Sequence, residues 1–348
     1  MTSNITVFES LCSNLNRHEA LHIPSPPHQK RRAAVAAILR WRRHRTDIEA
    51  VRGDKKVTSL KEFFEQDWVK QDPLGEAEIL FMQRTTRVGD RWSGHVSFVG
   101  GKNEPNETDE DTVKREVMEE IGIDLNTSDY IPVGKLDERE ISSIKDNKLL
   151  MILIPFVYLQ VVPESPRFKL QESEVAAVQW VPLSFFLSSK DTLYASYRPI
   201  TEQLSLVRLN KNKWVTSFIR LMMGSVTFAA IDLPTTRETR TNFRLWGLTM
   251  GMTRDIIQFA RLEEENLSFV KLVNARPIYS RPDIGWLALL FTQFTVYYKK
   301  LTTNIDYGAK SEWDKVYFAS IRRAVIFAVL LRLGFTSVVV TWLIKRIY

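Results

Sequence analysis

Three glutamates lie close together in the sequence and could bind a cation: Glu116, Glu119 and Glu120. Each residue of a helix advances by about 100°, so the three carboxylates would share one face within roughly 100° of arc. An apolar stripe lies beside them: Val113, Val117 and Ile121. Such a stripe packs a helix against a sheet. Because like charges repel one another, the cluster needs a neutralising cation, and hard carboxylate oxygens suit Mg²⁺ or Mn²⁺.

The residues around these glutamates form a longer pattern. It reads Gly101, five residues, Glu107, seven residues, and then Arg115-Glu116-Val117-Met118-Glu119-Glu120-Ile121-Gly122-Ile123. Every fixed position matches the Nudix box, so residues 101–123 resemble the catalytic motif of hydrolases that cleave a diphosphate between a nucleoside and another group. A solvated acidic helix is the alternative for the glutamates alone, and the register of the whole pattern disfavours it.

This resemblance implies a fold, a metal site and catalytic residues. The fold is an α/β/α sandwich with a mixed sheet, and the cofactor is Mg²⁺ or Mn²⁺. The implied metal ligands are Glu116, Glu119, Glu120 and the carbonyl of Gly101. The implied catalytic residues are Arg115, Glu116 and Glu119. Arg115 would pair with a neighbouring glutamate and orient it, whereas Glu107 would stabilise the loop and helix. The general base stays open between a glutamate of the motif and a loop carboxylate.

The segment before the motif resembles the coenzyme A diphosphatase group of Nudix enzymes. The residues that fit its outline are Arg84, Arg91, Gly94, Val96, Ser97, Phe98, Gly100 and Gly101. Two features depart from it, because Val99 stands where that group has proline and the Arg84–Gly94 spacing is one residue longer. The resemblance implies cleavage of coenzyme A or its acyl derivatives to 3′,5′-ADP and phosphopantetheine. Arg84 and Arg91 would bind the polyphosphate, and solvated loop charges are the other interpretation of these arginines.

Other functions fit the same motif. ADP-ribose, NAD-like dinucleotides and damaged nucleoside triphosphates are rival substrates, all of them nucleotide-derived small molecules. A membrane-tethered scaffold with an inactive Nudix domain is an alternative of another class, which the completeness of the motif disfavours.

Apolar runs predict the strands that position the motif. The expected buried strands are residues 32–41, 76–83, 149–162 and 179–183. Pro105 delays the acidic helix, and Thr108 or Asp109 would cap it. Residues 214–231 predict a helix followed by a strand, with a membrane-spanning helix as the alternative. A strand over 243–249 and a helix over 251–259 are expected to follow. Glu172 or Glu174 could add a carboxylate to the site, although we favour a structural role.

The chain of 348 residues divides into three expected regions. Residues 1–31 are polar and contain several prolines, so we expect a flexible lead-in. Residues 32–261 would form the Nudix hydrolase domain, and residues 262–348 a basic C-terminal region. The single cysteine excludes an internal disulfide. The formal charge of +7 arises from residues 276–348, which contain 11 Lys/Arg and 4 Asp/Glu. Because the residues before them are neutral overall, we expect no nucleic-acid-binding surface there.

The C-terminal region contains two candidate membrane helices, residues 284–298 and 324–344. The second has flanking cations and Trp342 near one end, which fit a span, whereas Arg332 near its middle costs about 2.5–3.5 kcal/mol. We expect a single C-terminal anchor with the catalytic domain in the cytosol, because no signal peptide precedes that domain. A soluble helical subdomain or a partner-binding hairpin is the alternative. A mitochondrial or peroxisomal location rests on weaker signals, since the N-terminal segment is not Arg-rich and the last residues are no peroxisomal signal.

Overall fold

The computed structural model describes ten stretches of the chain: residues 4–27, 31–44, 56–87, 92–142, 148–188, 190–203, 213–234, 243–260, 267–302 and 310–347. They form two compact units. The first unit comprises Met1–Ile141, Leu149–Arg198 and Ala229–Ala275. The second comprises Ser142–Lys148, Pro199–Phe228 and Arg276–Tyr348.

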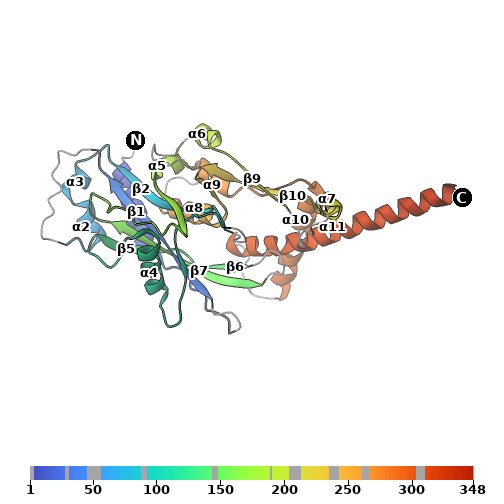
Figure 1. The fold of residues 1–348 in the computed structure, drawn as a ribbon, viewed down its shortest axis with the longest axis horizontal. Coiled ribbons are helices and arrows are strands. Elements are labelled where there is room, and N and C mark those ends of the chain that lie inside the picture. The colour runs from blue at the N-terminus through green and yellow to red at the C-terminus, as the bar shows by residue number, and fades with distance from the viewer. Residues whose placement is uncertain are drawn as a thin grey trace. The chain divides into compact units, whose positions relative to one another are not determined.

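A mixed eight-stranded sheet organises the first unit (Figure 1). Its strands are β1 (Arg32–Arg42), β2 (Glu76–Arg84), β3 (Val96–Ser97), β4 (Val99–Lys102), β5 (Tyr130–Lys135), β6 (Arg139–Ser142), β7 (Leu149–Gln160) and β8 (Val175–Pro182). The order β3-β2-β1-β7-β5 forms its main path, and β4, β6 and β8 pair with β1, β7 and β2. Strand β1 runs parallel to β7 and antiparallel to β2 and β4. The predicted mixed sheet is therefore confirmed.

Helices cover both faces of this sheet. On one face lies α4 (Asp109–Ile121), whose Val113, Val117 and Ile121 are fully buried, as the apolar stripe predicted. On the other lie α1 (Asn4–Asn16) and α8 (Gly247–Gln258). Successive residues of a strand point to opposite faces, and β1 follows this rule: Ala37 and Leu39 pack with α1 and α8, whereas Ala36 and Ile38 pack with α4.

Short elements complete the first unit. They are α2 (Leu60–Phe64), α3 (Asp67–Lys70), α5 (Leu183–Phe186), α6 (Lys190–Ala195), α9 (Ser268–Val273) and a two-stranded sheet of β11 (Ala230–Asp232) and β12 (Arg244–Trp246). Strand β12 leads directly into α8, which begins four residues earlier than the sequence indicated.

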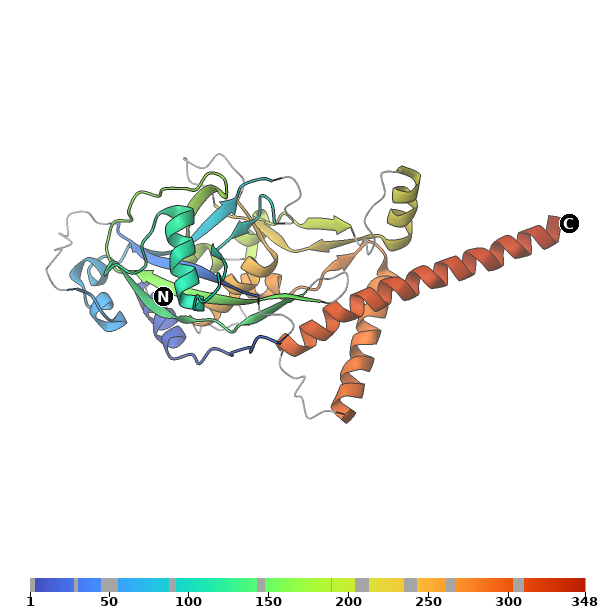
Figure 2. The same cartoon turned by 60° about the horizontal axis from the view of Figure 1, so that its bottom comes forward.

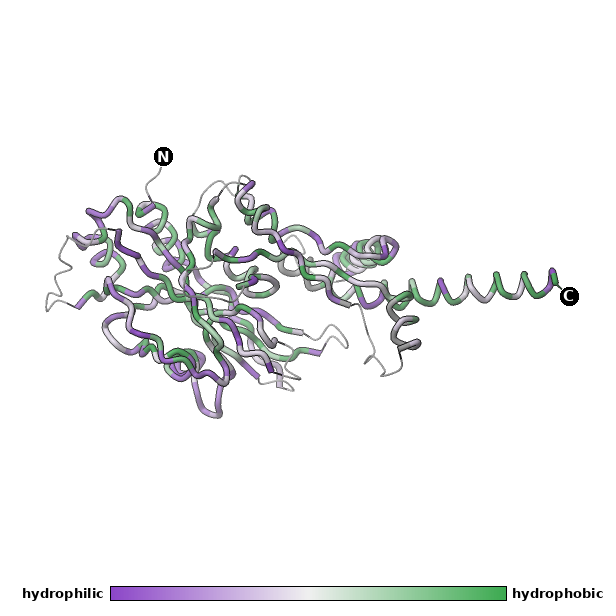
Figure 3. Tube along the Cα trace, turned by 45° about the horizontal axis from the view of Figure 1, so that its top comes forward, coloured by the Kyte–Doolittle hydropathy of each residue, from purple (hydrophilic) through white to green (hydrophobic). Residues whose placement is uncertain are grey.

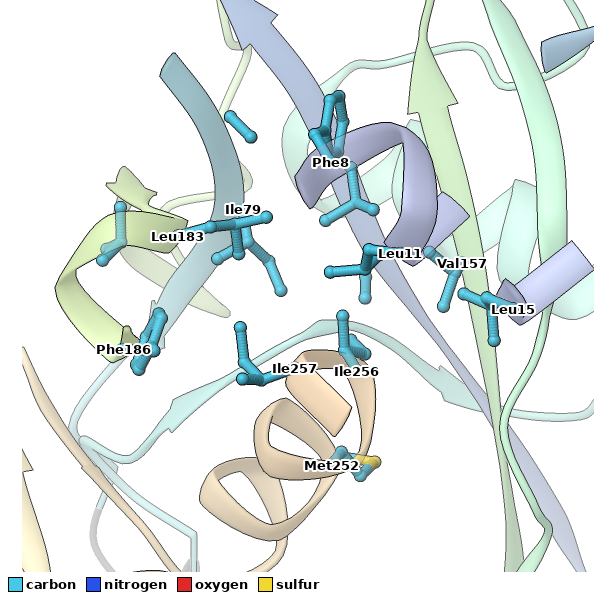
Figure 4. Packing of buried hydrophobic residues seen from close by; sticks show 14 of the residues in the cluster. Phe8, Leu11, Leu15, Ile79, Val157, Leu183, Phe186, Met252, Ile256 and Ile257 are labelled. Carbon is cyan, nitrogen blue, oxygen red and sulfur yellow. The ribbon is translucent and has the colours of Figure 1, made fainter. Parts of the chain in front are cut away.

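The expected flexible lead-in is wrong for residues 4–16, because α1 belongs to the core. Its apolar residues Phe8, Leu11, Cys12 and Leu15 follow a helical period and are at most 1% exposed. Figure 4 shows Phe8, Leu11 and Leu15 beside Ile256 and Ile257 of α8. Two hydrogen bonds hold α1 against the rest of the unit. The side-chain amide of Asn14 donates to the carbonyl of Phe259 at 2.9 Å, and that of Asn16 donates to the carbonyl of Val133 at 2.9 Å.

The expected domain boundary at residue 261 also differs from the structure. Helix α9 extends the first unit to Ala275, and Pro199–Phe228 belongs to the second unit. That second unit contains a three-stranded sheet of β9 (Ile200–Gln203), β10 (Ser225–Phe228) and β13 (Ile278–Tyr279).

Three helices accompany this small sheet in the second unit. They are α7 (Lys213–Met223), α10 (Pro282–Thr302) and α11 (Lys310–Ile347), and the last two contain the candidate membrane segments (Figure 2). Ile284 and Ala288 of α10 pack against Ala324 and Ala328 of α11. Val316–Ile347 is long and apolar enough to cross a membrane, judged by length and composition alone. Much of its C-terminal part is hydrophobic (Figure 3).

Candidate active site

The acidic helix α4 begins at a capping box. The hydroxyl of Thr108 accepts from the backbone N–H of Asp111 at 3.1 Å, and the Asp111 carboxylate accepts from the N–H of Thr108 at 3.1 Å. This reciprocal pair satisfies two N–H groups that would otherwise lack a partner. At the other end Gly122, with φ 73°, terminates the helix in the left-handed conformation. Residues next to each end of α4 therefore determine where this helix begins and ends.

Two adjacent glycines bring the backbone of β4 against this helix. Gly100 pairs with Val35 and Gly101 with Ala34 of β1. A Cβ at Gly100 would lie 2.2 Å from the carbonyl oxygen of Ala34, and its φ of 147° disfavours other residues. A Cβ at Gly101 would lie 2.4 Å from Oε1 of Glu116. Glycine is needed at Gly100 so that β4 can approach the backbone of β1, and at Gly101 so that β4 can approach Glu116 of α4.

The three glutamates differ in their surroundings. Glu120 is buried and accepts a hydrogen bond from the backbone N–H of Gly100 at 3.0 Å. Glu116 is mostly covered and lies beside Gly101. Glu119 is the outermost, with 54% of its side chain exposed. The structure thus brings Glu116, Glu120 and Gly101 together, with Glu119 at the rim.

Arg115 links the glutamates to the preceding loop. Its Nη1 donates to Oε1 of Glu116 at 3.1 Å and to Oε2 of Glu119 at 2.9 Å. Its Nε donates to Oε1 of Glu107 at 2.6 Å, and its Nη2 donates to the carbonyl of Lys102 at 3.2 Å. Glu107 also accepts from the Thr112 hydroxyl at 2.8 Å and from the N–H of Glu104 at 2.9 Å. Arg115 is thereby held so that it orients two of the site carboxylates.

Burial and charge separate the pKa values of these groups. Burial raises the pKa of Glu120 to about 8, although the Gly100 N–H opposes the shift and the charge of Glu116 adds to it. Burial also raises the pKa of Glu116, against the lowering effect of Arg115. The hydrogen bond from Arg115 lowers the pKa of Glu107 to about 2. Crowded, partly desolvated carboxylates of this kind are stabilised by a bound cation.

Carboxylates and a main-chain carbonyl are the ligands that Mg²⁺ and Mn²⁺ prefer. Within the described stretches, no three acidic, histidine or cysteine side chains converge closely enough to hold a metal ion. The donor chemistry nevertheless fits one, because Glu116 and Glu120 lie against the glycine pair and the exposed Glu119 can turn toward them. The residues that would hold the ion are those implied by the sequence motif.

Basic residues reach the same region from the end of β2. Arg84, its last residue, lies close enough to Glu120 to lower that group's pKa by its charge. Arg87 forms an ion pair with Glu174 at 3.3 Å and donates to the carbonyl of Ser173. Arg91, the other predicted substrate-binding residue, lies outside the described residues. Of the two predicted arginines, Arg84 is therefore the one whose position is known.

Two features of this region were missed or undervalued in the sequence. Glu174 raises the pKa of Glu116 and of Glu120 by its charge, so it lies near the site, whereas a purely structural role was favoured for it. The rings of His95 and Trp246 meet at 4.9 Å between centroids. The carbonyl of His95 accepts from the N–H of Arg84 at 3.0 Å. No local pattern indicated Trp246, because it is 151 positions from His95 in the chain.

Comparisons with known proteins match part of the chain to a domain family. Residues 69–204 match the model of the NUDIX domain. An uncharacterized protein of Schizosaccharomyces pombe is 28% identical over 279 residues, covering 78% of this chain and 76% of the relative.

Solved structures of Nudix proteins are similar to part of this chain. The Ap4A hydrolase of C. elegans is 15% identical, covering 44% of this chain and 80% of that one, with a TM-score of 0.28. The MutT NUDIX hydrolase of Burkholderia pseudomallei is 18% identical, covering 44% and 84%, with a TM-score of 0.26. Residues 69–204, which contain the motif and several strands of the mixed sheet, therefore form a NUDIX domain.

Proposed function

We propose that the chain hydrolyses the diphosphate linkage of a nucleotide derivative, with Mg²⁺ or Mn²⁺ as cofactor. The observation that carries this proposal is the arrangement of Glu116 and Glu120 against the glycine pair, with Arg115 orienting Glu116 and Glu119. A structural acidic helix would not require carboxylates on its sheet-facing side, where their burial is unfavourable.

Each residue has a distinct proposed role. Glu116, Glu119, Glu120 and the Gly101 carbonyl would hold the cation. When bound, the metal neutralises diphosphate oxygens and lowers the pKa of an attacking water. Arg115 fixes the direction of the Glu116 and Glu119 carboxylates, and its own position is fixed by Glu107 and the Lys102 carbonyl. Arg115 therefore acts through its neighbours.

Coenzyme A or an acyl derivative is the proposed substrate, with 3′,5′-ADP and phosphopantetheine as products. Arg84 supports a polyphosphate substrate of this kind, because a cation beside the carboxylate cluster can bind a phosphate there. We include Arg91 as a second phosphate-binding residue. The segment that resembles the closure of the coenzyme A-type domain also borders this region, since Thr249 donates to the carbonyl of Val96 at 3.1 Å.

The decisive experiment measures Mg²⁺-dependent release of 3′,5′-ADP from coenzyme A, with ADP-ribose and NAD as parallel substrates. Glu120→Gln should lower kcat/KM by more than about tenfold, because metal-site residues typically contribute at least that much. Glu110→Gln, on the same helix but in an ion pair with Lys114 at 2.9 Å, is the matched control and should remain active. Full activity of folded Glu120→Gln would refute the metal-helix mechanism.

The parallel substrates separate the alternatives. Turnover of ADP-ribose or NAD without turnover of coenzyme A would keep the reaction class and replace the substrate. Absence of turnover on every nucleotide, in a folded chain that still binds membranes, would favour the scaffold alternative.

We also propose that the C-terminal helix α11 attaches the protein to a membrane, with the catalytic domain in the cytosol. Large apolar side chains are exposed along its C-terminal part, among them Phe335, Val338 and Trp342. Lys345 and Arg346 follow them, and the guanidinium of Arg346 lies 4.8 Å from the Trp342 ring. An aromatic residue beside terminal cations is typical of the membrane–water interface. Apolar exposure on this scale is costly in water.

A further inference from the structure

Arg332 has partners in the second unit that explain its place in an apolar helix. Its guanidinium forms an ion pair with Asp283, near the start of α10, and donates to the carbonyl of Met222, near the end of α7. Beside it, Arg281 donates to the carbonyl of Leu221 at 2.8 Å. These groups line a cavity of about 430 Å³. Arg332 of α11 thus connects α7 and α10 through its hydrogen bond and its ion pair.

The same residue divides α11 into two parts with different surroundings. Before it, one face of the helix, with Ile321, Ala324, Val325 and Ala328, is buried in the cluster formed with α10, whereas the other face, which includes Leu330, is exposed. After it, the large apolar side chains are exposed, and the helix continues past the end of its packed region (Figure 2). The predicted span of residues 324–344 therefore begins where α11 packs against α10. Only the part after Arg332 is open to lipid on all sides.

Helix α7 presents an apolar face next to this division. Trp214, Phe218 and Leu221 recur at i, i+4 and i+7, and so lie along one side of the helix. Phe218 is 51% and Leu221 57% exposed. The guanidinium of Arg332 donates to the carbonyl of Met222, so this apolar face of α7 ends beside the point where α11 extends beyond α10. An amphipathic helix with exposed aromatic residues is suited to lie in the plane of a membrane interface.

We propose that Arg332 and Asp283 lie at the headgroup level of a bilayer, with α7 flat on that surface and only the part of α11 after Arg332 inside it. This inference rests on the proposed membrane association and specifies its depth. The occupant of the exposed faces is an anionic phospholipid bilayer. Exposed cations on both sides of the division, Arg322 and Arg323 before it and Lys345 and Arg346 after it, complement such lipids.

The length of the inserted part fits this placement. At about 1.5 Å per residue, α11 after Arg332 is roughly 22 Å long, shorter than a hydrocarbon core of about 30 Å. Lys345 and Arg346 would extend their side chains toward the far headgroups, or the bilayer would thin locally. With Arg332 at the interface, its ion pair stays out of the hydrocarbon, where a charge is costly.

Single-site labelling can measure the depth of each segment. Cys12, the only cysteine, is fully buried, so a cysteine introduced at the surface is the one accessible thiol. The full chain would carry Leu330→Cys, Val338→Cys, Phe218→Cys or, as an aqueous control, Lys61→Cys. Each would be labelled with an environment-sensitive fluorophore on vesicles of phosphatidylcholine and phosphatidylserine. Lipids brominated at defined acyl depths would serve as quenchers, and flotation would report binding.

The positions are chosen to separate two arrangements. Leu330 (61% exposed) and Val338 (67% exposed) are equidistant from the centre of a continuous 324–344 span, which predicts equal depth for both. The proposal predicts deep quenching at Val338, shallow quenching at Leu330 and Phe218, and none at Lys61. Equal quenching at Leu330 and Val338, or a Phe218 label that behaves like Lys61, would overturn it while leaving membrane association intact. Failure of the labelled chains to float would instead refute the membrane association itself.

A second variant tests Arg332 directly. In Leu330→Cys, the additional change Arg332→Leu removes the charge that sets the depth, so the label should move to the depth of Val338. Arg332→Lys should keep it shallow. An unchanged shallow position in Arg332→Leu would show that packing against α10, and not Arg332, fixes the depth, and would overturn this part of the proposal.

Discussion

Gly101 lies so close to Glu116 that even a methyl group would displace the carboxylate. In Gly101→Ala the added Cβ would lie 2.4 Å from Oε1. The end of a glutamate side chain can move, so we expect a stability loss of only about 1 kcal/mol. Hydrolysis should fall by more than about tenfold because Glu116 leaves its position. Gly334→Ala, inside helix α11 and with nothing within 4 Å of the new Cβ, is the control and should lose neither stability nor activity. Wild-type turnover in Gly101→Ala would show that the position of Glu116 is not critical.

Glu107 should link stability to pH through its pairing with Arg115. Its pKa is lowered to about 2 in the folded state, against about 4.3 in an unfolded chain. The folded state therefore gains stability from the ionised group above pH 4.3 and loses it as pH falls toward 2. Glu107→Gln should have a lower unfolding midpoint at pH 7. The difference from wild type should shrink between pH 4.3 and 2 in thermal unfolding curves, and a difference independent of pH would contradict the ion pair.

At the scale of elements, α1 holds one face of the sheet together. Leu11 is 1% exposed in the cluster with α8, so Leu11→Ala should lower the free energy of unfolding by about 2–5 kcal/mol. Glu9→Ala, exposed on the same helix, should change it little. Urea unfolding measures both. Burial, with a smaller contribution from the charge of Glu9, also raises the pKa of Cys12 far above its usual value, so the reaction of Cys12 with a thiol reagent should accelerate in Leu11→Ala, which opens the packing around it.

The elements predicted correctly are those whose signal is local. The acidic helix α4 has its cap, its apolar stripe and its glutamates within one short segment, and β1 and β7 are continuous apolar runs. Helix α1 was missed although its apolar residues follow a helical period, because its burial depends on distant partners such as Phe259, 245 positions away from Asn14. At the site, Glu174 reaches the glutamates through the pairing of β2 with β8. Contacts made by strand pairing between distant segments leave no periodic pattern in either segment alone.

At the scale of the whole molecule, the positive charge and the exposed apolar surface coincide in the C-terminal region. Residues 276–348 carry the net charge of +7, and most large exposed apolar side chains in the described residues occur in α10 and α11. The rest of the chain is neutral overall. A basic, apolar region attached to a neutral enzyme suits an anionic membrane, because electrostatic attraction and apolar burial then act on the same segment.

This predicts that membrane binding can be removed without loss of hydrolysis. Val338→Glu with Leu343→Glu places two charges on exposed positions after Arg332. Each charge costs about 2.5–3.5 kcal/mol in a bilayer, so binding to phosphatidylserine-containing vesicles should fall by more than about 100-fold. Phe318→Glu, exposed on the packed part of α11, is the control and should still bind. Hydrolysis of a soluble nucleotide should be equal in all three chains, because the substitutions lie outside the unit that carries the glutamates. Equal vesicle binding by the double variant and wild type would contradict attachment through this end of α11.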